Sequence, residues 1–187
     1  MRAPPAAGRT KFGPLITEFD ARSDALLEQV RGTRPVDVFF TAASHAGEFS
    51  LVWHVANVAR GSVVRRPDQV VALALALGAE SLLINQGLKR MFRRPRPTVE
   101  GDPRTPVRRP LTSSFPSGHA SAAAFNATVL TAWDPKRAPL WWTLAGAVAT
   151  SRVYVRLHHA SDVVGGLVVG TALGLVARRV IRAAGIR

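Results

Sequence analysis

Residues 163–177 read VVGGLVVGTALGLVA, an unbroken run of apolar residues, glycine and threonine. Gly166, Gly170 and Gly174 recur at every fourth position, so one face of a helix here carries a stripe of small residues. Such a stripe lets two helices pack closely in lipid, whereas in water each mid-helix glycine costs about 1 kcal/mol relative to alanine. The segment therefore favours a membrane helix over its alternative, a helix in a soluble all-helical bundle.

Four more apolar blocks precede this one, at residues 36–58, 70–88, 117–133 and 139–155. The first two have about the 20 residues that span a hydrocarbon core, while the other two are short enough to suit a soluble helical core as well. Residues 15–30 have the apolar spacing of an amphipathic helix but are too polar to cross a bilayer, so we expect them to lie along its surface. We predict an all-α fold, an integral membrane helical bundle with about five transmembrane helices plus this N-terminal amphipathic helix.

The composition narrows the class of protein. The 187 residues include 25 Lys or Arg, of which only three are Lys, against 12 Asp or Glu, giving a net charge of +13. Cysteine is absent, which excludes disulfides, zinc–thiolate sites, iron–sulfur clusters and thiol nucleophiles. A basic, apolar chain fits a nucleic-acid binder, a peripheral membrane protein or an integral membrane protein with an anionic ligand. We expect no nucleic-acid partner, because only Phe92 and Phe115 accompany the basic stretch, where base stacking would need interleaved aromatic residues.

The chain length indicates one domain, which we place at residues 14–187. Residues 1–13 are rich in Pro, Ala, Gly and Arg and lack the continuous apolar core of a secretory signal peptide, so we expect a flexible tail. Residues 89–114 contain five prolines, which remove backbone donors and clash with the preceding helical turn. We therefore predict a loop there.

Three polar clusters lie at the ends of apolar blocks: KRMFRRPRP at residues 89–97, SFPSGH at residues 114–119, and Ser151-Arg152 followed by His158 and Asp162. In the second cluster, Ser117 and Gly118 open a predicted helix, whose unpaired N–H groups and positive dipole end make an anion site. His119 falls in the first turn of that helix and is aimed at the bound group. The competing interpretation is a common Ser-Gly helix start with a surface histidine.

His158 and Asp162 are four residues apart, a spacing that places them on one face of a helix, where the carboxylate accepts the imidazole N–H and fixes its tautomer. A histidine oriented in this way is a metal ligand, a general base or a nucleophile. We expect no metal, because carboxylates are few and arginines abound. His159 points about 100° away on a helix and is treated as a bystander. Arg152 offers a planar fork to an oxyanion.

Lys89 and Arg96 complete a cage with Arg152 around a phosphoryl group. Other basic residues of the loop suit solvation and contact with anionic lipid head groups, namely Arg90, Arg104, Arg108 and Arg109. Arg93 and Arg94 suit either a second phosphate or head group, or simple solvation of the loop.

These clusters resemble the pattern of the type 2 phosphatidic acid phosphatase (PAP2) superfamily, the lipid phosphate phosphatases and their soluble relatives. The family pattern is Lys-x6-Arg-Pro, then Pro-Ser-Gly-His, then Ser-Arg-x5-His-x3-Asp. All eleven fixed positions match, from Lys89 to Asp162, and the resemblance covers roughly residues 36–183. It implies a six-helix core and hydrolysis of a phosphomonoester or diphosphate on a membrane lipid, with no metal and no cofactor.

The resemblance also implies a role for each matching side chain. His158 is the nucleophile that forms a phosphohistidine, Asp162 orients it, and His119 is the general acid that protonates the leaving oxygen. The phosphate oxygens are held by Lys89, Arg96, Ser117, Gly118 and Arg152. Phosphoryl transfer depends mainly on positioning and on neutralising spread charge, and a cationic cage of this kind provides both.

The candidate substrates are phosphatidic acid, phosphatidylglycerophosphate, polyprenyl diphosphates and polyprenyl-linked sugar phosphates such as decaprenylphosphoryl-5-phosphoribose. We favour a polyprenyl lipid, because the loop is rich in arginine and the chain is small. One alternative is a vanadate-dependent haloperoxidase-like enzyme, although those relatives are larger and soluble. Another is an inactive lipid-binding membrane scaffold, which the intact His119, His158 and Asp162 argue against. Basic links on the opposite face predict a plasma-membrane protein with an extracytoplasmic site.

Overall fold

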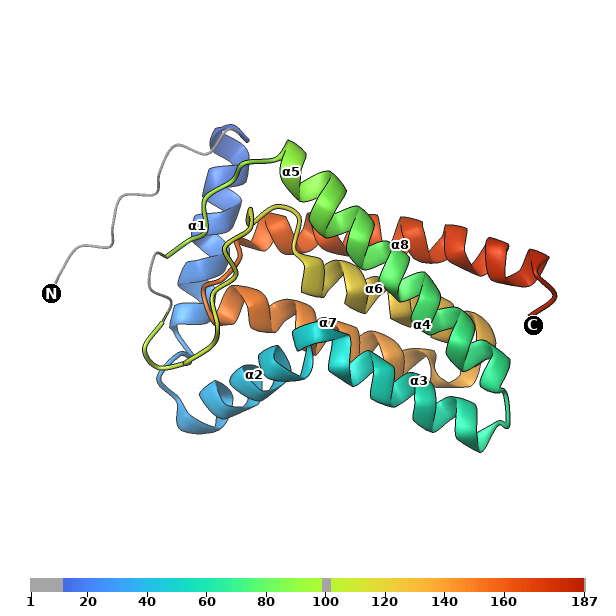
Figure 1. The fold of residues 1–187 in the computed structure, drawn as a ribbon. Helices are drawn as coiled ribbons and strands as arrows, with labels where there is room; N and C mark the ends of the chain where they lie inside the picture. The colour runs from blue at the N-terminus through green and yellow to red at the C-terminus, as the bar shows by residue number, and fades with distance from the viewer. Residues whose placement is uncertain (1–11, 99–101, 187) are drawn as a thin grey trace, which may run out of the picture.

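The computed structural model describes residues 12–98 and 102–186, and within these ranges every regular element is a helix (Figure 1). The elements run in the order α1 (Pro14–Glu28), α2 (Arg34–Ala46), η1 (Glu48–Ser50), α3 (Leu51–Val63), α4 (Pro67–Leu82), η2 (Leu83–Leu88), α5 (Lys89–Met91), α6 (Gly118–Trp133), η3 (Pro135–Arg137), α7 (Ala138–Tyr154) and α8 (Ala160–Ala183). The all-α prediction is confirmed. The predicted tail lies outside the described residues, except for its last two positions.

Proline sets the start of four helices. It occupies the first or second position of α1, α2, α4 and α7, where its fixed φ suits the helix and its missing N–H removes no bond. The helix α6 begins differently, because the Ser117 side chain accepts a hydrogen bond from Ala120 N at 3.4 Å. The predicted helix start at Pro116-Ser117-Gly118 is therefore confirmed.

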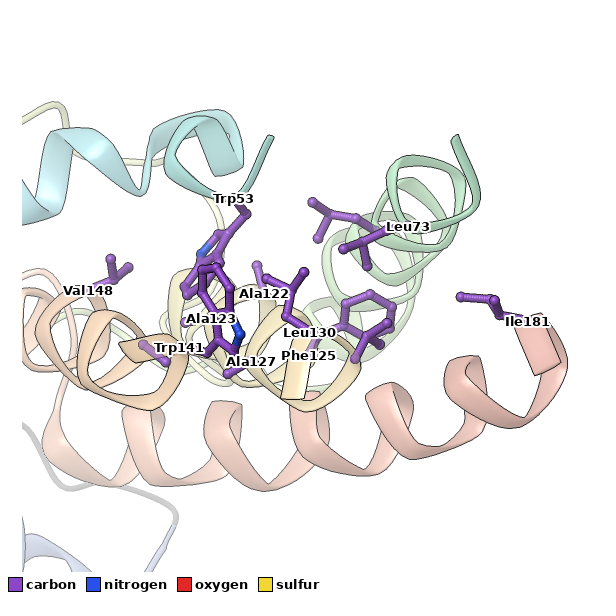
Figure 2. Packing of buried hydrophobic residues seen from close by; sticks show 13 residues of the cluster. Trp53, Leu73, Ala122, Ala123, Phe125, Ala127, Leu130, Trp141, Val148 and Ile181 are labelled. Atoms are coloured by element: carbon purple, nitrogen blue, oxygen red, sulfur yellow. The ribbon is translucent and has the colours of Figure 1, made fainter. Parts of the chain in front are cut away.

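The centre of the bundle is α6, which is buried on all sides from Ala120 to Leu130. Apolar side chains from the surrounding helices close around it, as Figure 2 shows for Trp53 of α3, Leu73 of α4 and Ile181 of α8. Five of the eleven residues from Ala120 to Leu130 are alanines, so the neighbouring helix axes can approach closely. A helix that is buried on all sides and mostly apolar is expected at the centre of a bundle.

The glycine stripe is the contact between α8 and α6. A Cβ added to Gly166 would lie 2.5 Å from Ser117 O, and one added to Gly170 would lie 2.1 Å from Ser121 O. Both distances are shorter than any real Cβ contact, so only glycine permits this approach. The close helix packing predicted from the stripe is confirmed.

The first apolar block differs from its prediction as one spanning segment. Residues 36–58 form two helices that meet at an angle, α2 and α3, because Phe49 and Ser50 take left-handed φ angles of 49° and 58° (Figure 1). Among the described residues, two continuous helices are long and apolar enough to cross a membrane, Pro67–Met91 and Ala160–Ala183. Helices occupy all five predicted blocks, so the helical structure of these blocks is confirmed, while five separate crossings remain a prediction.

Helix α1 forms as predicted and lies crosswise over one end of the bundle (Figure 1). It packs on α7 and α8, and Leu27 contacts the apolar clusters beneath it. Its outer face leaves Leu15 and Leu26 mostly exposed, which suits a helix at a bilayer surface. The one fully buried residue on α1 is the charged Asp20.

Candidate active site

The three polar clusters meet at the end of the bundle that α1 crosses. The first lies at the end of α5 and in the following loop, the second at the start of α6, and the third spans the end of α7 and the start of α8 (Figure 1). The turns after α3 and α6 and the end of α8 lie at the opposite end. The three clusters therefore share one end of the bundle, as the predicted cage requires.

His158 and Arg96 are in direct contact. Arg96 Nη1 lies 3.0 Å from His158 Nε2, and both residues are buried. A guanidinium can only donate, so Nε2 accepts this bond and holds its lone pair, which assigns the ring proton to Nδ1. Complete burial lowers the pKa of His158 to about 3, so the ring is neutral at pH 7. The site thus holds a neutral imidazole whose Nε2 electron pair accepts a hydrogen bond from a cation.

Arg96 is fixed by the loop around it. It donates to Leu157 O at 2.7 Å, to Pro110 O at 3.1 Å and to Thr112 O at 3.2 Å. Burial lowers the pKa of this guanidinium to about 10, so it remains charged at pH 7. The proline-rich loop therefore aims one planar cation at the imidazole.

The relation between His158 and Asp162 differs from the predicted one. His158 precedes the helix, because α7 ends at Tyr154 and α8 begins at Ala160. Its backbone N–H donates to Arg152 O at 3.0 Å, which holds it in the turn between the two helices. Asp162, in the first turn of α8, reaches back so that Oδ2 lies 3.7 Å from His158 Nδ1. The two side chains are close, as predicted, but the prediction that they share one face of a helix was wrong.

His159 is also placed differently from its prediction on a helix. It caps α8, and its backbone N–H donates to Asp162 Oδ2 at 2.9 Å. His159 therefore helps to orient the Asp162 carboxylate through its backbone N–H, and not through its imidazole. A carboxylate near the start of a helix can accept hydrogen bonds from the free N–H groups there.

Lys89 and Gly118 are neighbours in the structure. A Cβ added to Gly118 would lie 3.4 Å from Lys89 Nζ, so the ammonium stands beside the start of α6. Lys89 donates to Asn85 Oδ1 at 2.9 Å, one turn earlier on the π-helical segment η2. The sequence did not indicate a role for Asn85, because a single Asn in an apolar helix belongs to no recognisable ligand motif.

His119 lies in the first turn of α6 against the bend between α2 and α3. Gly47 leaves room for it, because a Cβ there would come 2.6 Å from His119 Cδ2. Within the described chain, His119 Nε2 is buried without a hydrogen-bond partner. The same polar cluster acts on it electrostatically through Arg152, His158, Lys89 and Arg96. His119, the candidate general acid, therefore lies next to the phosphate cage with one ring nitrogen that makes no hydrogen bond.

Arg152 is buried at the end of α7 and donates from Nη1 to Ser44 Oγ of α2. The sequence did not indicate a role for Ser44, because a single serine in an apolar block has many ordinary roles. Ser117 ties the two central helices together at the site, since its N–H donates to Asp162 O at 3.0 Å. Its hydroxyl accepts the capping bond and keeps its own proton for a ligand.

The basic loop also forms ion pairs with helix α1. Arg104 donates to Asp102 at 2.7 Å and pairs with Glu28 of α1 at 3.2 Å, and these bonds hold the pKa of both carboxyl groups below their usual range. Arg104, expected to be a solvated loop residue, instead fastens the loop to α1. A cavity of about 610 Å³ opens beside Lys89 and Arg96 and is also lined by Arg90, Arg93, Arg94 and Arg109.

Across residues 12–98 and 102–186, no group of three or more His, Asp or Glu side chains gathers in a way that could hold a metal ion. Three cations, two imidazoles and the carboxylate of Asp162 converge at the site. Such a set recognises a phosphoryl group by charge and by planar hydrogen bonding.

The helical fold and the cationic site are those expected of a helical membrane enzyme that acts on phosphate groups. Comparison with known families gives this class a name, since residues 69–186 match the PAP2 superfamily. The chain belongs to the PAP2 superfamily.

Individual proteins and solved structures are also similar to this chain. Decaprenylphosphoryl-5-phosphoribose phosphatase of Mycobacterium tuberculosis is 30% identical over 135 residues, which cover 71% of this chain and 73% of that protein. The crystal structure of a transmembrane PAP2-type phosphatidylglycerolphosphate phosphatase of Bacillus subtilis has the same fold, with a TM-score of 0.72 and 24% identity over 92% of this chain and 89% of that one. LpxE of Aquifex aeolicus matches with a TM-score of 0.70 and 26% identity over 90% of this chain and 98% of that one. The chain is accordingly a membrane phosphatase that acts on lipid phosphates.

Proposed function

We propose that this phosphatase hydrolyses a phosphomonoester or diphosphate on a polyprenyl lipid, through a phosphohistidine at His158 and without a metal ion. The observation that carries the proposal is the bond from Arg96 to His158 Nε2. It leaves the electron pair of a neutral imidazole next to a cation that can take hold of a phosphoryl oxygen. A polyprenyl substrate is supported by the relative from M. tuberculosis, whose name specifies one.

In the first step, Arg96 moves its hydrogen bond from His158 Nε2 to a phosphoryl oxygen. The freed Nε2 electron pair attacks phosphorus, and the bond from phosphorus to the leaving oxygen breaks. With the anionic substrate bound, His119 carries a proton and gives it to that oxygen, so the lipid alcohol or lipid phosphate leaves without an added charge. The phosphorylated ring is positively charged, and Asp162, 3.7 Å from Nδ1, stabilises it. Lys89, Arg96 and Arg152 neutralise the three outer oxygens of the transferring group.

In the second step, water attacks phosphorus and the bond from phosphorus to Nε2 breaks. His119 now accepts the proton of the water, which returns the enzyme to its starting protonation state. Inorganic phosphate is released, and the Nε2 electron pair is again free to accept from Arg96.

Phosphate release by the purified protein in detergent tests this function. The assay contains EDTA and a panel of phosphatidic acid, phosphatidylglycerophosphate, polyprenyl diphosphate and polyprenyl-linked sugar phosphate, beside a His158→Ala control. We expect release that survives EDTA, is fastest with a polyprenyl lipid and is lost in the control. Release that needs a metal, or that persists in His158→Ala, would overturn the mechanism, and a glycerolipid preference would overturn the substrate.

We also propose that the site faces away from the cytoplasm. Among the described residues, eight basic ones lie at the opposite end of the bundle: Arg60, Arg65, Arg66, Lys136, Arg137, Arg178, Arg179 and Arg182. Positively charged loops remain cytoplasmic. The cysteine-free chain permits a direct test with Arg108→Cys in the loop and Lys136→Cys at the other end, both exposed positions. An impermeant maleimide added to intact cells should label only Arg108→Cys, and the reverse pattern would refute the orientation.

A further inference from the structure

Arg94 is a buried cation between two carboxylates, one of which belongs to the site. Nη1 donates to Asp162 Oδ1 at 2.5 Å, and Nη2 donates to Asp20 Oδ2 at 2.6 Å. The Arg94 side chain is 2% exposed and the carboxylates are 0% and 7% exposed. Phe12 lies under the guanidinium, with its ring centre 4.7 Å from Cζ. Charges buried this deeply are retained only when they are paired and hydrogen-bonded.

Asp162 therefore has two sets of partners. Oδ1 accepts from Arg94, whereas Oδ2 accepts from His159 N and faces His158 Nδ1. Arg94 also donates to Ser161 Oγ at 2.7 Å, the residue before Asp162. These bonds leave the carboxylate one orientation, with Oδ2 toward the imidazole.

Asp20 brings α1 into this arrangement. Its Oδ1 accepts from Ser161 N at 2.8 Å, and its Oδ2 accepts from Ser161 Oγ at 2.9 Å and from Arg94. Asp20 thus binds the start of α8 and the cation at the same time. It lies outside the residues that match the family, which begin at residue 69.

The charges have a direct consequence for the imidazole. Alone, Arg94 would draw the charge of Asp162 toward Oδ1 and away from His158. Asp20 supplies a second negative charge on the far side of Arg94, so that Asp162 keeps more of its effect on His158. The other charged or titratable groups that face His158 are Arg96 from the loop, Arg152 from α7 and His119 from α6.

We propose that Asp20 and Arg94 are positioning residues for the hydrolysis proposed above, on which this inference rests. They hold Asp162 Oδ2 toward His158 Nδ1 and set how strongly the carboxylate supports positive charge on the ring. Helix α1 is by this account part of the active site, because it supplies Asp20.

Arg31 provides a matched control. It is as deeply buried as Arg94, with 1% side-chain exposure, and it also fastens α1 to the bundle. It pairs with Asp24 at 2.7 Å and donates to Tyr154 O at 2.9 Å, but it does not contact Asp162. Replacing Arg31 removes a comparable buried cation without touching the carboxylate of the site.

The test compares Arg94→Gln, Arg94→Lys, Asp20→Asn and Arg31→Gln in the full chain in detergent. For each we would measure thermal stability, kcat/KM for phosphate release, and the protonation of His158 by ¹⁵N-histidine NMR, with the signal assigned by its loss in His158→Gln. We expect Arg94→Gln to lower kcat/KM by about 10–100-fold, the range for removing an outer partner that orients a site ligand. Arg94→Lys should recover part of the loss, Asp20→Asn should show a smaller one, and Arg31→Gln should keep kcat/KM within about two-fold.

The NMR signal separates positioning from stability. Without the guanidinium, Asp162 acts on His158 alone, so the ring should begin to take up a proton at a higher pH in Arg94→Gln than in the wild type. Arg31→Gln should titrate as the wild type does. An unchanged His158 signal in Arg94→Gln, or equal losses of kcat/KM in Arg94→Gln and Arg31→Gln, would overturn the inference. A wild type without phosphatase activity would refute the proposed function instead, and the NMR comparison would still decide the role of Arg94.

Discussion

The helices α6 and α8 contact each other in two very different ways along their length. In the middle of the bundle the contact is apolar and close, and a Cβ on Gly170 would come 2.1 Å from Ser121 O. At the end crossed by α1 the same two helices are joined by a hydrogen bond, in which Ser117 N donates to Asp162 O at 3.0 Å. The glycine contact sets the separation of the two helices, and the polar end uses that separation to bring its functional groups together.

This division predicts that the two regions respond differently to substitution. Changes at the polar end should remove activity and leave the bundle folded, because they replace side chains of the proposed site. Changes at the glycine contact lower stability and activity together, because they force the helices apart. The following experiments test that contrast, from the largest expected effect to the smallest.

His158→Ala should lose essentially all phosphate release. Removing the nucleophile of a hydrolase lowers kcat by about 10⁴–10⁶-fold. The thermal midpoint in detergent should change by only a few degrees, since His158 lies in a turn outside the helices. A circular dichroism melt beside the phosphate assay checks both, and a variant that no longer folds would contradict the proposed division.

Arg96→Lys should lower kcat by about 10²–10³-fold, as the loss of one charged hydrogen-bond donor at a transition state does. Lysine keeps the charge but lacks the planar fork that reaches Leu157 O and His158 Nε2 together. Steady-state kinetics on the best lipid phosphate measure this effect. Full activity in Arg96→Lys would show that a point charge is sufficient there.

Gly170→Ala should lower the free energy of unfolding by about 1–3 kcal/mol, the usual cost of overpacking. Its control is Gly146→Ala in α7, where an added Cβ meets nothing within 4 Å and the helix should gain up to about 1 kcal/mol. Thermal melts of both variants decide the point. Equal melting temperatures would mean that the glycine contact does not set the helix separation.

The pH dependence of stability should reveal the buried imidazole. Burial lowers the pKa of His158 to about 3, while the unfolded chain has a value near 6.5. Below pH 6.5 the unfolded state therefore binds a proton that the folded state does not, and stability falls as the pH falls toward 3. His158→Gln removes this contribution, so its thermal midpoint should fall less than that of the wild type between pH 7 and pH 5. Parallel curves for the two proteins would contradict a neutral buried ring.

The sequence was most informative where spacing translates directly into geometry. Ser117 at a helix start and the four-residue glycine period were correctly placed, because helix capping and helix periodicity are local properties. The match of the three clusters to the family pattern also predicted which side chains would lie together at the site. The structure then supplied the bonds that hold them, such as the one from Arg96 to the imidazole.

The sequence was least informative where the chain changes direction. The bend at Phe49 and Ser50 interrupts an apolar block without a proline, so nothing local marked it. The break after Tyr154 removed His158 from the helix on which its spacing with Asp162 had placed it. Asp20 could not be identified either, because an acidic residue on an amphipathic helix is ordinarily solvated, and its burial depends on Arg94, which lies 74 residues away.

The central claim is that the phosphoryl group passes through His158. Wild-type protein mixed with a polyprenyl diphosphate, quenched in alkali within milliseconds and digested, would be analysed by mass spectrometry for phosphohistidine. The account predicts a phosphate on the peptide that contains His158, formed in the presence of EDTA and absent from His158→Ala. Rapid phosphate release with no phosphorylated histidine at any quench time, or with the phosphate on His119, would contradict it.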